Sequence, residues 1–178
     1  MVTPATRERQ RFADELLVVG PDAPTLCDPW TTRDLAAHIV MRDRRPDAAP
    51  GVLVSKFAGY TQKIQARIAA GDWGTIVDSV RHGPPAWSPA RVPAIARLIN
   101  TAEFFVHHED VRRASPAWSP RELDDDLVTD LHAALGRAAP LLTRKSPVGI
   151  VLAPDDSRSS ITAKQATPSI TGRGPVGE

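Results

Sequence analysis

The chain has one cysteine, Cys27, and no apolar run long enough to cross a membrane. A single cysteine permits no disulfide within the chain, which is typical of proteins in a reducing cytoplasm. The longest apolar stretch spans only residues 35–41, whereas a transmembrane helix needs about 20 residues. The first ten residues include no apolar signal core, so we expect the protein to be cytoplasmic.

The chain also has no excess of charge of either sign. Its 22 basic and 21 acidic residues give a formal net charge of +1. A dedicated nucleic-acid-binding protein usually needs a strongly basic face, so the charge balance argues against that class of function. The length of 178 residues indicates one domain, or one domain with a small appendage.

Proline, in contrast, is abundant, with 17 residues in clusters. Proline cannot continue a helix interior, so the clusters divide the chain into segments, and each segment before residue 145 has apolar residues at helical spacing. Thr31 to Asp34 form a capping-box-like start for the second helix. The helices are expected over 7–19, from 31 to the 44–47 breaker, and over 54–70, 72–81, 93–114 and about 119–142. Such helices predict a mainly α protein built as a helical bundle.

The phrase Pro-Ala-Trp-Ser-Pro occurs twice, at 84–89 with an extra proline and at 116–120. Each copy reads as a helix start in which serine caps a helix that begins with proline. In the second copy Ser119 and Glu122 would form a capping box. The tryptophans would pack against the first turns as hydrophobic staples, pairing Trp118 with Leu123 and Trp87 with Val92.

After Lys145 the apolar pattern changes from helical to alternating. Strands are expected over 148–153, 160–163 and 169–171, with a turn at Pro-Asp-Asp-Ser. The sequence therefore predicts residues 1–145 as a helical bundle and residues 146–178 as a short β-like tail.

The densest group of polar residues lies on the helix expected over 93–114. Glu103 and His107 are one turn apart and project from one side of that helix. A helical wheel centred on the apolar stripe places Glu103, His107 and Asp110 at its edge and turns Phe104 and His108 away. The tract 108–113 reads most simply as a solvated face with a Glu109–Arg113 pair.

His38 is the third candidate, because it lies inside the most apolar stretch of the chain. Two histidines and a carboxylate from different helices would leave coordination positions open, as in catalytic zinc or non-haem iron sites. On spacing alone, two simpler interpretations stay open: His38 as a satisfied core residue, and Glu103 with His107 as an ordinary polar pair. Cys27 is expected to be a bystander, with a fourth ligand or a reactive thiol as alternatives.

Two stretches, Trp30-Thr-Thr-Arg-Asp-Leu-Ala-Ala-His38 and Asn100-Thr-Ala-Glu-Phe-Phe-Val-His-His-Glu-Asp110, together resemble a known family. They are similar to the mycothiol-dependent maleylpyruvate isomerase-like proteins of the DinB superfamily, and most of all to an uncharacterised actinobacterial branch. The resemblance implies a DinB-like four-helix bundle that holds one divalent metal, typically Zn²⁺. The ligands it implies are His38, Glu103 and His107, with Asp110 orienting an imidazole.

The same resemblance implies an activity. In characterised relatives the metal activates a low-molecular-weight thiol such as mycothiol, which attacks a small electrophile. The expectation is a thiol-dependent transferase or isomerase with a small-molecule ligand and no nucleic-acid or membrane partner. A non-catalytic metal-binding or structural module is one alternative, and a metal-dependent hydrolase with Glu109 or Asp110 as base is another. The characterised isomerases have a larger C-terminal domain, so the tail after residue 145 is expected to be truncated relative to the family.

Overall fold

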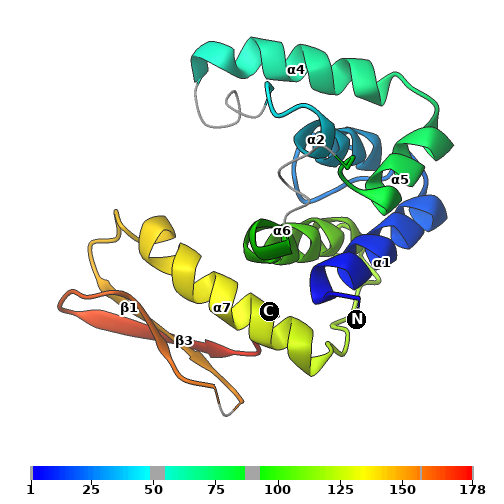
Figure 1. The fold of residues 1–178 in the computed structure, drawn as a ribbon. Coiled ribbons are helices and arrows are strands. Elements are labelled where there is room, and N and C mark those ends of the chain that lie inside the picture. The colour runs from blue at the N-terminus through cyan, green and yellow to red at the C-terminus, as the bar shows by residue number, and fades with distance from the viewer. Residues whose placement is uncertain (1, 49–54, 87–92, 157, 178) are drawn as a thin grey trace. The chain divides into compact units, whose positions relative to one another are not determined.

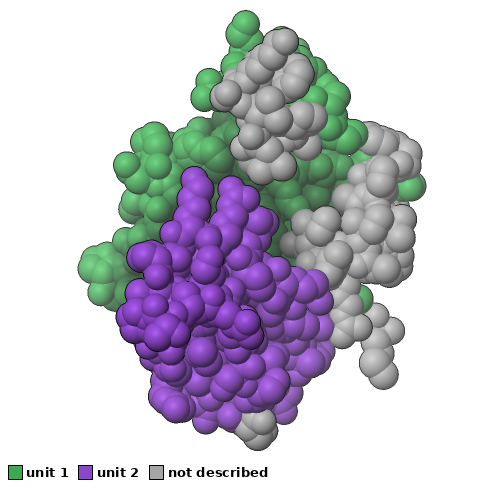
Figure 2. Space-filling view, turned by 90° about the vertical axis from the view of Figure 1, so that its left-hand side faces the viewer, with its two compact units in different colours: residues 1–119 green, residues 120–178 purple. Residues whose placement is uncertain are grey.

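The computed structural model describes residues 2–48, 55–86, 93–156 and 158–177. Its internal contacts divide the chain into two compact units, residues 1–119 and 120–178, which Figure 2 distinguishes by colour. The chain is mainly helical, with a small three-stranded sheet near the C-terminus, as the sequence predicts. The sequence placed the last helix with the bundle, whereas the structure groups it with the sheet, because this helix packs against a strand of that sheet.

The first unit consists of helices from several parts of its sequence (Figure 1). Its helices are α1 (Pro4–Val19), α2 (Thr32–Arg44), α4 (Ser55–Ala69), α5 (Trp73–His82) and α6 (Pro93–Arg112). Helix α1 packs against α5 and α6, while α2 packs against α4 and α5. These helices lie where the proline-bounded segments predict them.

Side-chain caps set the beginnings of three of these helices. The predicted capping box of α2 is present: the Thr31 side chain accepts from the Asp34 backbone N–H, and the Asp34 carboxylate accepts from the Thr31 backbone N–H. At α1 the Thr3 side chain accepts from the Thr6 backbone N–H, and at α5 the Asp72 carboxylate accepts from the Thr75 backbone N–H. Each cap satisfies backbone N–H groups that have no partner within the helix.

The core of the first unit is formed where α1, α2, α5 and α6 meet. Most of its largest fully buried side chains are apolar, and burying each apolar one contributes roughly 1.5–3 kcal/mol. They include Phe12, Leu16, Leu35, Ile39, Val77, Val80 and Phe104. This core fixes the rotation of α2 and α6 about their axes and thereby decides which polar side chains face each other.

One ion pair and one buried carboxylate–histidine contact cross the same core. Arg9 of α1 donates to Asp43 of α2 at 2.5 Å and to the Val80 carbonyl at 2.9 Å, and its guanidinium lies 4.0 Å from the centre of the Phe104 ring. Glu8 is fully buried and contacts Nδ1 of His108 at 2.8 Å. Buried charges need such partners, because an unpaired charge away from water is costly.

The second unit combines helix α7 (Asp125–Leu142) with a sheet of order β2-β1-β3. Strands β1 (Gly149–Pro154) and β2 (Ile161–Lys164) are antiparallel, while β1 and β3 (Ser169–Gly174) are parallel. Helix α7 packs against β2, and Thr143 just beyond its end donates to the Ala163 carbonyl at 3.0 Å. All three strands occur where the alternating pattern predicts them.

The interpretation of the repeated phrase as two helix starts is wrong for the second copy. Residues 117–124 are not helical, and α7 begins only at Asp125, so Ser119 and Glu122 form no capping box. Trp118 instead lies beside Arg113, whose guanidinium carbon is 4.7 Å from the centre of the Trp118 ring. Ser88 of the first copy and the expected Trp87–Val92 staple lie outside the described residues.

Among the described residues, no helix has the length and apolar content required to cross a bilayer.

Candidate metal centre

His38 lies on α2 at a position that the helix buries. The neighbouring Leu35 and Ile39 are fully buried in the core, and His38 itself is only 7% exposed. Its ring lies beside the indole of Trp30, with 5.1 Å between ring centres. The capping box and the core thus hold the imidazole in one direction, toward α6.

Glu103 and His107 lie on α6, one turn apart. Their facing atoms, Oε1 of Glu103 and Nε2 of His107, are 3.1 Å apart. Their side chains are 27% and 15% exposed, so they sit at the edge of the core as the helical wheel predicts. The i,i+4 spacing that suggested the pair therefore brings the two side chains into contact.

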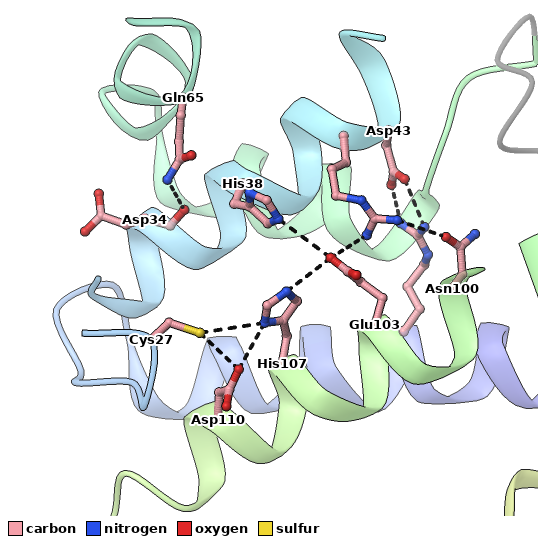
Figure 3. Close-up of polar contacts among 11 residues, drawn as sticks. Cys27, Asp34, His38, Asp43, Gln65, Asn100, Glu103, His107 and Asp110 are labelled. Atoms are coloured by element: carbon pink, nitrogen blue, oxygen red, sulfur yellow. Dashed lines mark hydrogen bonds and ion pairs between the residues drawn. The ribbon is translucent and has the colours of Figure 1, made fainter. Parts of the chain in front are cut away.

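The three predicted residues converge on one point between α2 and α6 (Figure 3). Oε1 of Glu103 is 3.6 Å from Nε2 of His38, and the two imidazole rings are 5.6 Å apart at their centres. One ligand atom from each residue lies within 4.8 Å of the others. In a tetrahedral zinc site, ligand bonds of about 2.0–2.1 Å place neighbouring N and O atoms roughly 3.3 Å apart. Oε1 of Glu103 lies 3.1 and 3.6 Å from the two imidazole nitrogens, which is close to this value.

Arg42, one turn after His38, supplies a positive charge to the same carboxylate. Its Nη1 lies 2.8 Å from Oε1 of Glu103, and its Nη2 donates to Asn100 at 3.4 Å. Nη1 is buried, and its contact with Glu103 lacks hydrogen-bond geometry. The guanidinium is therefore a counter-ion for Glu103 rather than an aligned hydrogen-bond donor.

Both α6 groups have strongly shifted pKa values. Burial alone would raise the pKa of Glu103, but contacts with His107 and His38 and the charge of Arg42 together hold it well below its usual range. Burial alone would lower the pKa of His107, but its hydrogen bonds to Asp110 and Glu103 and their negative charges raise it to about 9. The contacts thus favour an ionised carboxylate beside a protonated imidazole.

Asp110 holds the other side of the His107 ring. Its Oδ2 lies 3.1 Å from Nδ1 of His107, the nitrogen that does not face Glu103. Burial alone would raise the pKa of Asp110, but its hydrogen bonds with His107 and Cys27 lower it. A carboxylate on the outer nitrogen fixes the ring orientation and raises its basicity, so Asp110 is placed as the resemblance implies.

Cys27, expected from the sequence to be a bystander with a fourth ligand or a reactive thiol as alternatives, contacts this cluster. Its thiol donates to Oδ2 of Asp110 at 3.0 Å, and Sγ lies 3.9 Å from Nδ1 of His107. Burial, the Asp110 hydrogen bond and nearby negative charges raise its pKa to about 12, so the thiol stays protonated. No spacing signal links Cys27 to α6, because the contact depends on how the loop before α2 folds back.

The helical wheel is wrong for the opposite side of α6. Phe104 and His108, which were turned away from the core, are buried, and His108 is paired with Glu8, while Val106 is 51% exposed. Glu109 does pair with Arg113 at 3.0 Å as predicted, but it is buried and not part of a solvated face. The reason is that α6 packs against α1, which buries the side of α6 that carries Phe104 and His108.

No protein-family model, curated protein or solved structure matches this chain, so its function has to be inferred from the chemistry of these side chains.

Proposed function

We propose that the first unit binds one divalent cation, Zn²⁺ in the first instance, through His38, Glu103 and His107. The observation that carries the proposal is the convergence of one carboxylate oxygen and two imidazole nitrogens at separations of 3.1 and 3.6 Å from that oxygen. Nitrogen and oxygen donors from three side chains suit zinc and also Fe²⁺ or Ni²⁺. In this proposal the unit is the DinB-like four-helix bundle that the sequence resembles.

Three protein ligands would leave at least one coordination position for an external ligand, as in catalytic rather than structural zinc sites. Two neutral imidazoles and one carboxylate leave a divalent ion with a net charge of +1, and Arg42 adds a further positive charge beside it. An anionic external ligand is therefore favoured. The partial exposure of Glu103 and His107 gives such a ligand a route from solvent.

The reaction we propose is that of a thiol-dependent transferase or isomerase acting on a small electrophile, with mycothiol or a similar thiol as cosubstrate. A bound divalent metal supplies a Lewis acid that lowers the pKa of a thiol at its open position. His38, Glu103 and His107 would hold that metal, and Asp110 would keep the His107 ring oriented through its contact with Nδ1.

A metal-dependent hydrolase is less well supported by the contacts. It would need Glu109 or Asp110 as a base for water at the metal. Glu109 is paired with Arg112 and Arg113, at 2.8 and 3.0 Å. Asp110 contacts the nitrogen of His107 opposite to the one facing Glu103. A non-catalytic module would use the same three ligands and differ only in lacking turnover.

Metal analysis of the purified protein tests the ligand set. Because the further site proposed below could bind a second ion, the comparison is made in a Cys27→Ser background. We expect one equivalent of metal there, and almost none when His38→Ala is added. His82→Ala is a matched control, because His82 is an exposed histidine of the same unit. Equal metal content in the His38 and His82 variants would reject the assignment.

A cobalt-substituted sample of the same Cys27→Ser protein tests the thiol. Added mycothiol or a simple thiol should produce a sulfur-to-cobalt charge-transfer band. Because no cysteine remains in this variant, such a band must come from the added thiol. An inert module or a hydrolase would leave the spectrum unchanged by thiol. A spectrum that responds to phosphate or carboxylate but not to thiol would favour the hydrolase.

A further inference from the structure

A second group of donors lies on the far side of the His107 ring. Cys27, Asp110 and Nδ1 of His107 each offer one ligand atom, and these atoms lie within 4.8 Å of one another. Figure 3 shows the thiol, the carboxylate and the ring nitrogen pointing toward one another. The group shares only His107 with the site described above, and it uses the opposite nitrogen of that ring.

The separations in this group fit a tetrahedral metal site. Sγ is 3.0 Å from Oδ2 of Asp110 and 3.9 Å from Nδ1 of His107, and Nδ1 is 3.1 Å from Oδ2. With a zinc–sulfur bond of about 2.3 Å and zinc–nitrogen or –oxygen bonds of about 2.0–2.1 Å, tetrahedral ligand atoms lie roughly 3.3–3.6 Å apart. Shifts of a few tenths of an ångström would bring all three donors onto one ion.

The loop that presents Cys27 is held in place by backbone hydrogen bonds. The Leu26 N–H donates to the Asp110 carbonyl at 3.0 Å, which ties the loop to α6 directly beside the cluster. The Trp30 N–H donates to the Cys27 carbonyl at 2.9 Å, and the Cys27 N–H donates to the Thr25 hydroxyl at 3.1 Å. The thiol therefore reaches the cluster from a preformed turn, so little ordering is required to bind an ion.

The charges also favour a divalent ion. A thiolate, a carboxylate and a neutral imidazole together carry two negative charges, which a divalent cation neutralises. The sulfur donor selects thiophilic ions such as Zn²⁺, Co²⁺ or Cd²⁺ over Mg²⁺ or Ca²⁺. Cys27 is partly exposed and the Asp110 side chain is 18% exposed, so the group can be reached from solvent.

We propose that Cys27, Asp110 and Nδ1 of His107 form a second cation site, selective for thiophilic divalent metals. Binding there releases the Cys27 thiol proton and the proton on Nδ1, because both atoms must be deprotonated to act as ligands. With both sites filled, the His107 ring would have lost the protons of both nitrogens and would bridge the two ions as an imidazolate anion. The proposal goes beyond the first site, since Cys27 and Asp110 are not among its ligands.

The test is a titration of the metal-free full-length protein with Co²⁺ alone, followed by absorption. Cys27 is the only cysteine, so any sulfur-to-cobalt charge-transfer band must come from it. We expect the wild type to bind two equivalents and to develop this band. Cys27→Ser should lose the band and one equivalent, while His38→Ala should keep the band and lose the other equivalent. This separates failure of the second site from failure of the first.

A second variant distinguishes this site from one formed by the cysteines of two chains. Asp110→Asn should weaken the cobalt species that shows the charge-transfer band at least about tenfold, since it removes a ligand. Circular dichroism checks that each variant is folded. Absence of the band in the folded wild type would overturn the proposal, as would a band whose cobalt affinity Asp110→Asn leaves unchanged.

Discussion

Metal binding at the first site should release a proton from His107. In the metal-free protein this imidazole lies between Glu103 and Asp110, at 3.1 Å from each, and its pKa is raised to about 9. A metal ion needs the neutral ring as a ligand, so it must displace the proton on Nε2. The perturbation is the addition of Zn²⁺ to the metal-free Cys27→Ser protein, in which serine can still donate to Asp110 but supplies no thiol.

The size of the effect follows from that pKa. A pH of 7 is two units below the pKa of the His107 ring, so the protonated form exceeds the neutral form by about 100 to 1. Displacing the proton at pH 7 therefore costs about 2.7 kcal/mol, which weakens the apparent zinc affinity about 100-fold relative to high pH. His107 should release about one proton per ion at pH 7 and about half a proton at pH 9.

Isothermal titration calorimetry measures the released protons directly. The observed enthalpy is plotted against the ionisation enthalpy of several buffers at each pH, and the slope gives the number of protons. A slope near zero at pH 7 would refute the reasoning, because His107 would then be neutral before the metal binds. A slope that stays the same between pH 7 and pH 9 would also contradict it.

Four further predictions concern stability and affinity. Because the pKa of His107 is raised in the folded state, its stabilising contribution is complete below about pH 6.5 and is lost as the pH rises through about 9. The melting temperature of the metal-free protein should therefore fall over this pH range, and it should fall less in His107→Gln. Asp43→Ala leaves a buried guanidinium unpaired and should lower the free energy of unfolding by about 3–5 kcal/mol in urea denaturation, whereas Asp47→Ala, at an exposed pair, should change it little. Thr31→Ala removes the cap of α2 and should cost about 1 kcal/mol in the same assay. Arg42→Gln removes a positive charge 2.8 Å from the Glu103 carboxylate and should tighten zinc binding severalfold in a competition titration; weaker binding would show that Arg42 supports the site.

The helices and strands were predictable because their signals are local. Proline clusters, the Thr31–Asp34 capping box and the alternating pattern after Lys145 each depend on a few neighbouring residues. The helix start predicted at the second copy of the repeated phrase is wrong, although its signal is also local. Serine and proline at 119–120 permit a helix start, but the chain stays non-helical until Asp125.

The candidate site was predictable only in part. The i,i+4 spacing placed Glu103 and His107 together, and the apolar surroundings of His38 marked it as buried. Arg42 contacts Glu103, 61 positions later in the chain, and Cys27 contacts Asp110, 83 positions later. No local sequence pattern reveals contacts over such separations. That these residues bind a metal stays a prediction, as does the resemblance to the DinB superfamily.

The burial of α6 could not be judged from one helix alone. A single wheel assumes one apolar face, but α6 packs against α1 on one side and reaches α2 through the side chains of Glu103 and His107 on another. His108 is buried because Glu8, on a helix 100 residues earlier, supplies its partner. A buried carboxylate–histidine contact of this kind leaves no apolar pattern in the sequence.

The most direct test of the metal centre is a crystal structure of the zinc-loaded Cys27→Ser protein with anomalous diffraction at the zinc edge. We expect one anomalous peak within about 2.0–2.2 Å of Nε2 of His38, a carboxylate oxygen of Glu103 and Nε2 of His107. A peak bound by other residues, or no peak with the Arg42–Glu103 ion pair intact, would contradict it.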